Sequence, residues 1–269
     1  MATALITGGT SGIGAAFASQ LAARGTDLVL VARDSERLVA RASELHAAYG
    51  INVETISADL GASGDVARVA ARLDDLDRPI DMLVSSAGAP VRTPLTSTDT
   101  ALHEHAFNVM CRATFVLGAA AARSMRARSS GTIITISSLQ SLLTTGSYSA
   151  IKAWVTSYSQ ALAVEMRGTG VTVTAVLPGW VQTEWHAAEG GRRSSIPGWL
   201  WTSAELTARI ALRDAARGRV ICIPTVRYRV LGWFARHLPR GVVRSISGAL
   251  SSSKNASGSE PTVVEAERS

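Results

Sequence analysis

The sequence predicts an α/β protein with a doubly wound, seven-stranded parallel sheet flanked by helices. Seven short apolar runs have the pattern of strands covered on both faces, at 4–6, 28–31, 53–56, 82–84, 133–136, 171–176 and 220–223. Alanine-rich amphipathic stretches separate them, at about 12–24, 35–49, 63–76, 99–127, 147–168 and 202–216. Because strands and helices alternate, the strands are expected to be joined by crossovers and to run parallel.

Composition places the chain among ordinary globular proteins. Its 269 residues, 46% of them hydrophobic, suit a single domain over about 1–250 with a large core. Two cysteines, Cys111 and Cys222, are too few for a disulfide framework or a four-ligand zinc site, so no metal is predicted. No run of 18 apolar residues and no secretory signal is apparent, which favours a cytoplasmic protein.

The C-terminal quarter is basic. The chain carries a net charge of +6, and residues 215–259 contain eight basic residues and no acidic one. Between 224 and 250, aromatic and aliphatic residues alternate with arginines at helical spacing, which predicts a short helical extension. It could lie on a membrane surface, cover a substrate pocket, or pack on the core or a second subunit. Residues 251–269, rich in serine and charge, are expected to form a disordered tail.

A glycine-rich turn joins the first strand to the first helix, in the order Thr7-Gly8-Gly9-Thr10-Ser11-Gly12-Ile13-Gly14. Glycines let the backbone approach a pyrophosphate closely, and the following helix N-terminus favours an anion. This position is typical of a Rossmann-like dinucleotide site, although a tight turn without a ligand is the plain alternative.

The end of the second strand indicates which cofactor is preferred. Ala32 stands where NAD-binding folds carry an acidic residue, and Arg33 follows it. An arginine suits a 2′-phosphate, so NADP(H) is favoured over NAD(H). Asp34 is adjacent to Arg33, and Arg33 could instead be an ordinary surface residue.

A set of four polar residues, Asn108, Ser138, Tyr148 and Lys152, indicates acid–base chemistry. Tyr148 and Lys152 are four residues apart, so they share one face of a helix. A cation about 4 Å from the phenol is expected to lower its pKa by about three pK units. Ser138 ends the preceding strand, where ligands bind, and Asn108 interrupts an apolar helix.

Together these motifs resemble the classical short-chain dehydrogenase/reductase family over residues 3 to 223. The family's acid on the adenine side matches Asp59, and Ser86-Ala87-Gly88 stands for its Asn-Ala-Gly motif. The resemblance implies that Tyr148 exchanges a proton with the substrate oxygen, Ser138 polarises that oxygen, Lys152 lowers the tyrosine pKa and holds the nicotinamide ribose, and Asn108 anchors a water-linked proton path. The implied cofactor-binding set is Thr7, Gly8, Thr10, Ser11, Gly12, Ile13, Gly14, Arg33, Asp59, Leu60, Ala87, Gly88, Tyr148, Lys152, Pro178, Gly179, Val181 and Thr183.

Three departures from the family pattern bear on these expectations. Ser86 replaces the first asparagine of Asn-Ala-Gly, so we expect a local change in hydrogen bonding. Ser138 and Tyr148 are ten residues apart instead of thirteen, which leaves Ser137 as an alternative to Ser138. The glycine-rich turn lacks a basic residue at Ser11, so the preference for NADP(H) depends mainly on Arg33.

The substrate is expected to be bulky and apolar. Residues 178–200 form a long irregular segment, predicted to be a substrate lid, and Trp180, Trp185, Trp199 and Trp201 fall in or beside it. These tryptophans could equally pack the lid on the core or contact a subunit. The segment 224–240 is similar to an actinobacterial subgroup related to long-chain, mycolate-type 3-oxoacyl reductases.

The resemblance therefore implies an NADP(H)-dependent oxidoreductase that interconverts a carbonyl and a secondary alcohol, with a 3-oxoacyl lipid as the leading substrate. A steroid or polyketide ketone is an alternative substrate. A catalytically silent NADP-binding sensor or scaffold and a membrane-peripheral adaptor are alternative functions. A homodimer or homotetramer is expected by resemblance, and no nucleic-acid partner is expected.

Overall fold

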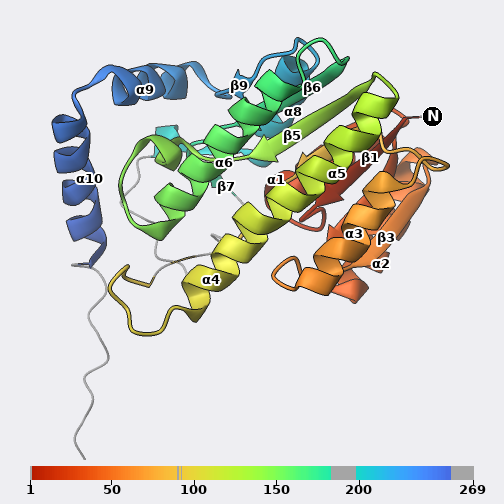
Figure 1. Cartoon of the computed structure of the whole chain (residues 1–269), viewed down its shortest axis with the longest axis horizontal. Helices are drawn as coiled ribbons and strands as arrows, with labels where there is room; N and C mark the ends of the chain where they lie inside the picture. Colours follow the sequence, from red (N-terminus) through yellow and green to blue (C-terminus); the bar gives the residue numbers. More distant parts are fainter. Residues whose placement is uncertain (1, 90, 92, 183–197, 256–269) are drawn as a thin grey trace, which may run out of the picture.

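The computed structural model describes residues 2–89, 91, 93–182 and 198–255, and its centre is a seven-stranded parallel sheet (Figure 1). The strands follow the order β3-β2-β1-β4-β5-β6-β9. They span Thr3–Thr7 (β1), Asp27–Ala32 (β2), Val53–Ser57 (β3), Met82–Ser85 (β4), Gly131–Ile136 (β5), Val171–Val176 (β6) and Ile221–Cys222 (β9). The doubly wound fold class and all seven strands are confirmed.

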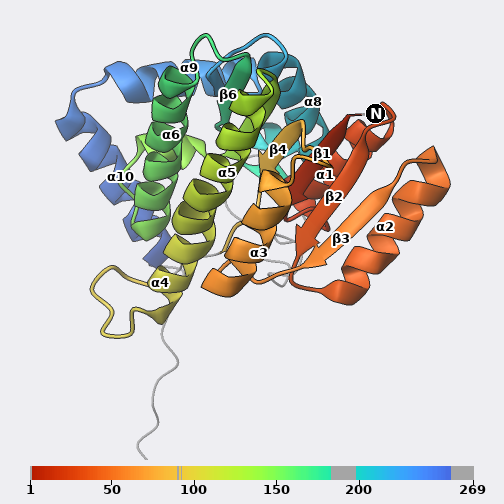
Figure 2. The same ribbon diagram turned by 45° about the vertical axis from the view of Figure 1, so that its right-hand side comes forward.

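Helices cover both faces of this sheet (Figure 2). They are α1 (Gly12–Ala22), α2 (Ser35–Tyr49), α3 (Ser63–Asp74), α4 (Ala101–Phe107), α5 (Ala113–Ala127), α6 (Ser147–Glu165), α8 (Ala204–Ala215), α9 (Val226–His237) and α10 (Arg240–Asn255). Successive side chains of one strand enter different cores: Leu5 packs toward α3, α5 and α6, while Ala4 and Ile6 pack toward α1, α2 and α8. The continuous apolar runs in the sequence follow from this two-sided burial.

The strand order reverses at β1, which lies between β2 and β4. The crossover connections leave β1 and β4 in opposite directions, so the loops after these two strands separate and leave a crevice at their carboxyl ends. Thr7 and Ser85 end these two strands in register with each other. The glycine-rich turn and Ser86-Ala87-Gly88 therefore begin at the edge of the crevice.

The long helix predicted over 99–127 is interrupted. Residues Asn108–Arg112 form a π-helical turn between α4 and α5, so that the Ala113 N–H donates to the carbonyl of Asn108. One extra residue is accommodated in that turn, which re-aims the side chains around it. The predicted helical stretch is present from Ala101 to Ala127, and the π turn within it was not predicted because it has no distinct hydrophobic period.

The chain after β9 forms two helices, as the sequence predicts for 224–250. However, α10 continues to Asn255, so the boundary between the helical extension and the tail moves from 250 to 255. Serines such as those at 251–253 disfavour an isolated helix. Here they extend α10, which is held against the protein by the buried residues Val243 and Ser247. The rest of the predicted tail, 256–269, lies outside the described residues, as does most of the predicted lid, 183–197.

Several short elements follow the strands at the carboxyl end of the sheet. They are two 3₁₀ turns, η2 (Leu139–Leu142) and η3 (Gly198–Leu200), and a two-stranded parallel pair of β7 (Val181–Gln182) and β8 (Thr202–Ser203). This pair was not predicted, and it joins the two ends of the lid segment. None of the helices in the described part of the chain has the length and apolarity needed to span a bilayer.

Candidate active site

The turn between β1 and α1 has a shape that depends on its glycines. Gly8 and Gly12 have φ angles of 68° and 53°, which strain residues that carry a side chain. A Cβ on Gly14 would lie 2.1 Å from the carbonyl oxygen of Gly8, so any larger residue would push α1 away from the turn. The first turn of α1 contains no acidic residue, and its N-terminus remains favourable for an anion. The turn therefore fits a pyrophosphate.

Thr7 ties this turn to the segment after β4. Its Oγ1 accepts hydrogen bonds from the backbone N–H groups of Ser86 and Ala87, at 3.0 and 3.1 Å. A Cβ on Gly8 would lie 3.2 Å from Cα of Ala87, so the two segments are in close contact. Ser86 contributes its backbone N–H to this junction. A serine and an asparagine have the same backbone N–H, so replacing the family's asparagine by Ser86 leaves this contact in place.

Two arginines lie beside the turn, one of which the sequence analysis missed. Arg33 is exposed at the end of β2. Arg37, one helical turn later, donates from Nη2 to the carbonyl oxygen of Thr10 at 3.4 Å. Asp34 caps α2 by accepting from the Arg37 N–H at 3.0 Å, so its carboxylate is engaged in the helix start. The i, i+4 spacing of the two arginines was the signal available in the sequence.

Asp59 lies two residues after β3, the strand that pairs with β2. Ser57 Oγ donates to the carbonyl oxygen of Arg33 at 3.1 Å, which joins the two strand ends. The Asp59 carboxylate accepts from the Gly61 N–H at 2.9 Å, and its own N–H donates to Asp65 at 2.6 Å. Leu60 is buried. The predicted adenine-side residues therefore border the crevice on the β2–β3 side.

Ser138, Tyr148 and Lys152 are brought together at the carboxyl end of β5. Tyr148 and Lys152 occupy the first two turns of α6, and Lys152 Nζ lies 5.6 Å from the centroid of the Tyr148 ring. The Ser138 side chain lies close enough to the Tyr148 hydroxyl to lower its pKa. Ser138 also accepts from the Gln140 N–H at 3.1 Å, which orients its hydroxyl.

Ser137, the residue before Ser138, has a structural role. Ser137 Oγ donates to the carbonyl oxygen of Lys152 at 2.8 Å and lies 2.6 Å from Thr156 Oγ1. It therefore holds β5 against α6, and Ser138 is the serine beside Tyr148. The alternative assignment of Ser137 finds no support in these contacts.

Burial dominates the electrostatics of the cluster. It raises the pKa of Tyr148 to about 12, although the neighbouring Ser138 side chain lowers it. Burial also lowers the pKa of Lys152 to about 8, and Cys111 nearby raises it. The expectation that the tyrosine pKa lies about three pK units below its ordinary value is wrong here. The ammonium donates to the carbonyl oxygen of Ile136 at 2.8 Å and faces the ring, and desolvation outweighs its field.

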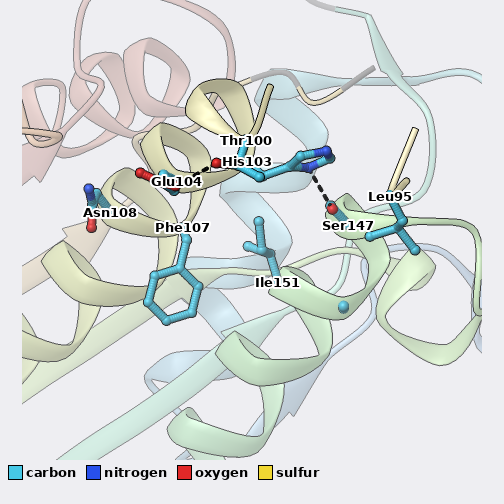
Figure 3. A pocket seen from close by; sticks show the side chains of 9 residues that line it. Leu95, Thr100, His103, Glu104, Phe107, Asn108, Ser147 and Ile151 are labelled. Carbon is cyan, nitrogen blue, oxygen red and sulfur yellow. Dashed lines mark hydrogen bonds between the residues drawn. The ribbon is translucent and has the colours of Figure 1, made fainter. Parts of the chain in front are cut away.

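Asn108 opens the π-helical turn and is half-buried, but no hydrogen bond joins it to Ser138, Tyr148 or Lys152 within the described residues. It lines a neighbouring cavity of about 520 Å³ between α4 and α6 (Figure 3). The lining residues are Leu95, Thr100, His103, Glu104, Phe107, Asn108, Ser147, Ala150 and Ile151. The cavity thus reaches the residue before Tyr148 without including the cluster.

The His103 side chain extends from α4 across this cavity to Ser147, at the start of α6. Its Nδ1 lies 2.7 Å from Ser147 Oγ, and its Nε2 lies 3.1 Å from the carbonyl oxygen of Pro94. A carbonyl only accepts, so Nε2 carries the hydrogen in the neutral ring and Nδ1 accepts from the serine. His103 therefore connects the loop after β4 to α6.

The loop after β6 is held by a buried tyrosine that the sequence analysis also missed. Tyr228 of α9 accepts from the Trp180 N–H at 3.0 Å and donates to the carbonyl oxygen of Leu200. A Cβ on Gly179 would lie 2.0 Å from Cζ of Tyr228. Pro178 accepts from the Leu139 N–H at 2.9 Å. Pro178, Gly179 and Val181 are thus placed beside the site, whereas Thr183 lies outside the described residues.

The chain is similar to known proteins over most of its length. A very-long-chain 3-oxoacyl-CoA reductase of Anas platyrhynchos is 30% identical over 258 residues, 91% of this chain and 78% of the relative. The structure of a short-chain dehydrogenase from Sphingobium yanoikuyae in complex with NADPH superposes with a TM-score of 0.77, at 31% identity, covering 99% of each chain. A bulky-bulky ketone specific alcohol dehydrogenase from Comamonas testosteroni gives a TM-score of 0.75, at 28% identity, covering 99% of this chain and 97% of the other. The family model for short chain dehydrogenases matches residues 2–193, and the chain belongs to this family of oxidoreductases.

Proposed function

We propose that the protein is an NADPH-dependent reductase of a bulky apolar ketone, such as a 3-oxoacyl lipid, with Tyr148 as the general acid. The observation that carries the proposal is the cluster of Ser138, Tyr148 and Lys152 at the end of β5, beside a crevice that fits a pyrophosphate. A bound NADPH supplies the hydride; the residues of this chain supply orientation and the proton.

The protonation state of Tyr148 favours the reductive direction. With a pKa of about 12, its phenol keeps its proton at neutral pH and is a donor. In reduction, the hydroxyl gives this proton to the substrate oxygen as that oxygen gains negative charge, and the tyrosinate is then reprotonated from solvent. Ser138 is placed to hydrogen-bond the same oxygen. The ammonium of Lys152 stabilises the tyrosinate that forms, and it is available to hydrogen-bond a ribose.

The preference for NADPH is supported by two cations beside the glycine-rich turn. Arg33 and Arg37 both flank the site where an adenosine ribose would lie in this family, and the neighbouring Asp34 is occupied in capping α2. A 2′-phosphate would gain charge-assisted hydrogen bonds from either guanidinium, which a 2′-hydroxyl cannot form. The neighbouring structure with NADPH is consistent with this preference.

A large apolar substrate is supported by the surroundings of the cluster and by the relatives. Trp180 and Trp201 lie at the two ends of the lid segment, which Tyr228 holds beside the site. One relative acts on very-long-chain 3-oxoacyl-CoA, and one structural neighbour on ketones with two bulky substituents, according to their names. We further propose that the enzyme is cytoplasmic and a homo-oligomer, as is common in the family, and that Asn108 serves the proton path.

The test is NADPH oxidation against ketones from small alkyl ketones to long 3-oxoacyl thioesters, with NADH in parallel. We expect kcat/KM to rise with chain length. Tyr148→Phe is expected to lower kcat by about 10²- to 10⁴-fold. Tyr158→Phe, ten residues later on the same helix, is the matched control and should leave the rate unchanged.

A third variant tests the cofactor. Arg33→Ala is expected to raise the KM for NADPH about 10- to 100-fold through loss of a charge-assisted hydrogen bond, with little change for NADH. Faster turnover of the wild type with NADH would contradict the cofactor assignment. Tight NADPH binding without oxidation by any ketone, in wild type and Tyr148→Phe alike, would contradict the proposed activity and favour an NADP-binding sensor.

A further inference from the structure

The two C-terminal helices, α9 and α10, form an arm at one edge of the molecule, beyond α6 (Figures 1 and 2). We call residues 226–255 the C-terminal arm. Its outer surface carries seven of the large hydrophobic side chains that are exposed in the described residues: Val226, Val230, Leu231, Trp233, Phe234, Val242 and Ile246. Such a concentration on one short segment is uncommon on a protein surface that meets only water.

On α9 these side chains form a stripe. Val226, Val230, Trp233 and Phe234 follow the spacing i, i+4, i+7, i+8, so they share one face of the helix. They are 71%, 51%, 56% and 49% exposed. His237 continues the stripe, and its ring stacks on Trp233 at 4.5 Å between centroids, while Phe234 meets Trp233 edge-on at 5.1 Å. The stripe therefore ends in a cluster of three rings.

The opposite face of α9 is anchored to the protein body. Tyr228 and Gly232 are buried on that side. A Cβ on Gly232 would lie 3.1 Å from Ile223 and 3.2 Å from Leu139, so the helix packs closely against both. On α10, Val243 and Ser247 are buried, and Ser247 Oγ accepts from the Thr144 N–H at 3.1 Å. The anchored faces fix the exposed stripe in an outward orientation.

The arm is also strongly cationic. Residues 226–255 contain five arginines and one lysine, and no acidic residue. Arg236 flanks the aromatic cluster on α9, and Arg240 and Arg244 follow it on α10; all three are exposed. An apolar stripe with aromatic rings, bordered by arginines and free of carboxylates, matches the interface of an anionic bilayer, where rings enter the acyl boundary and guanidinium groups meet phosphates.

We propose that the C-terminal arm binds the surface of membranes that contain anionic lipids, with Trp233 and Phe234 inserted at the interface. A second copy of the chain is a poorer occupant. Two-fold pairing of the arm with itself would bring identical arginine clusters together without a single carboxylate to compensate them. The proposal concerns a surface outside the catalytic cluster and does not depend on the proposed reaction.

The experiment is co-sedimentation of the full chain with vesicles of phosphatidylcholine alone or with phosphatidylglycerol added. We expect binding to the anionic vesicles and little to the neutral ones. Trp233→Ser combined with Phe234→Ser is expected to weaken binding at least about tenfold. The matched control, Val39→Ser with Leu76→Ser, removes two side chains that are each 59% exposed elsewhere and should leave binding intact.

A second pair of variants separates local charge from net charge. Arg236→Gln with Arg244→Gln is expected to weaken binding by about fivefold for each arginine. Arg24→Gln with Arg167→Gln lowers the net charge equally at exposed sites outside the arm and should change little. Thermal unfolding and NADPH binding of each variant report that it is folded.

Three outcomes would overturn the proposal. Wild-type protein that does not bind anionic vesicles excludes a lipid-binding arm. Equal weakening by the Arg236/Arg244 variant and by the Arg24/Arg167 control shows that net charge, not the arm, attracts the protein. Self-association that is lost in the Trp233/Phe234 variant, without vesicle binding, assigns the arm to a contact between copies.

Discussion

Replacing Lys152 by methionine should stabilise the protein while it disables the site. Burial lowers the pKa of this lysine from its ordinary value of 10.5 to about 8, so holding the ammonium in the folded state has a cost. A difference of about 2.5 pK units corresponds to about 3 kcal/mol at pH 7. Methionine fills a similar volume without charge, but it leaves the Ile136 carbonyl without its 2.8 Å donor, which costs about 1 kcal/mol. The expected net gain is about 2 kcal/mol.

The dependence of this gain on pH identifies its cause. Between pH 8 and 10.5 the unfolded lysine binds more protons than the folded one, so the stability of the wild type rises with pH in this window. The penalty falls from about 3 kcal/mol at pH 7 to about 1.4 kcal/mol at pH 9.5. Lys152→Met should therefore lose most of its advantage at the higher pH.

The assay is thermal unfolding without cofactor at pH 7 and pH 9.5, at a fixed protomer concentration. A net gain of about 2 kcal/mol corresponds to a Tm higher by about 4–8 °C for a domain of this size. Arg126→Met, which removes an exposed cation from α5, is the control and should change Tm little. A Lys152→Met variant that is no more stable at pH 7, or whose gain is the same at both pH values, would refute the reasoning.

Two further predictions test Tyr228 and His103, which the sequence did not reveal. Gly179→Ala should destabilise the protein by about 3 kcal/mol in urea unfolding, because its Cβ would lie 2.0 Å from the Tyr228 ring, whereas Gly198→Ala, with open space around its Cβ, should not. If both variants are equally stable, Tyr228 does not hold the loop. His103→Ala should raise the substrate KM about 5- to 10-fold with a smaller change in kcat, because it frees the Pro94 segment from α6. Ser147→Ala should have the same effect, and the double variant should be no worse than either alone; additive effects would show that the two residues act separately.

Much of the fold could be predicted because its signal is local. The central strands are buried on both faces, so a run such as Ile133 to Ile136 is mostly apolar, and the alternation with helices dictates a parallel sheet. The glycine-rich turn and the Tyr148–Lys152 pair are likewise short motifs whose spacing determines their geometry. Their placement at the carboxyl ends of β1 and β5 follows from the topology alone.

The missed features depend on contacts between distant segments. Tyr228 lies among arginines and aliphatic residues that predict only an amphipathic helix, and its role becomes visible where its hydroxyl meets Trp180 and Leu200. The π turn at Asn108 has no compositional signature. The sign of the Tyr148 pKa shift was predicted wrongly because spacing indicates the nearby charge of Lys152 but not the burial that outweighs it.

Helix α9 joins the two regions of the protein that the proposals concern. Its buried face carries Tyr228, which holds both ends of the lid segment, and Gly232, which packs on Leu139 directly after Ser138. Its exposed face carries Trp233 and Phe234. Truncation after β9 would therefore remove a wall of the catalytic site together with the arm, and loss of activity would say nothing about membranes. Substitutions confined to the exposed face leave Tyr228 and Gly232 in place, so they separate membrane binding from catalysis.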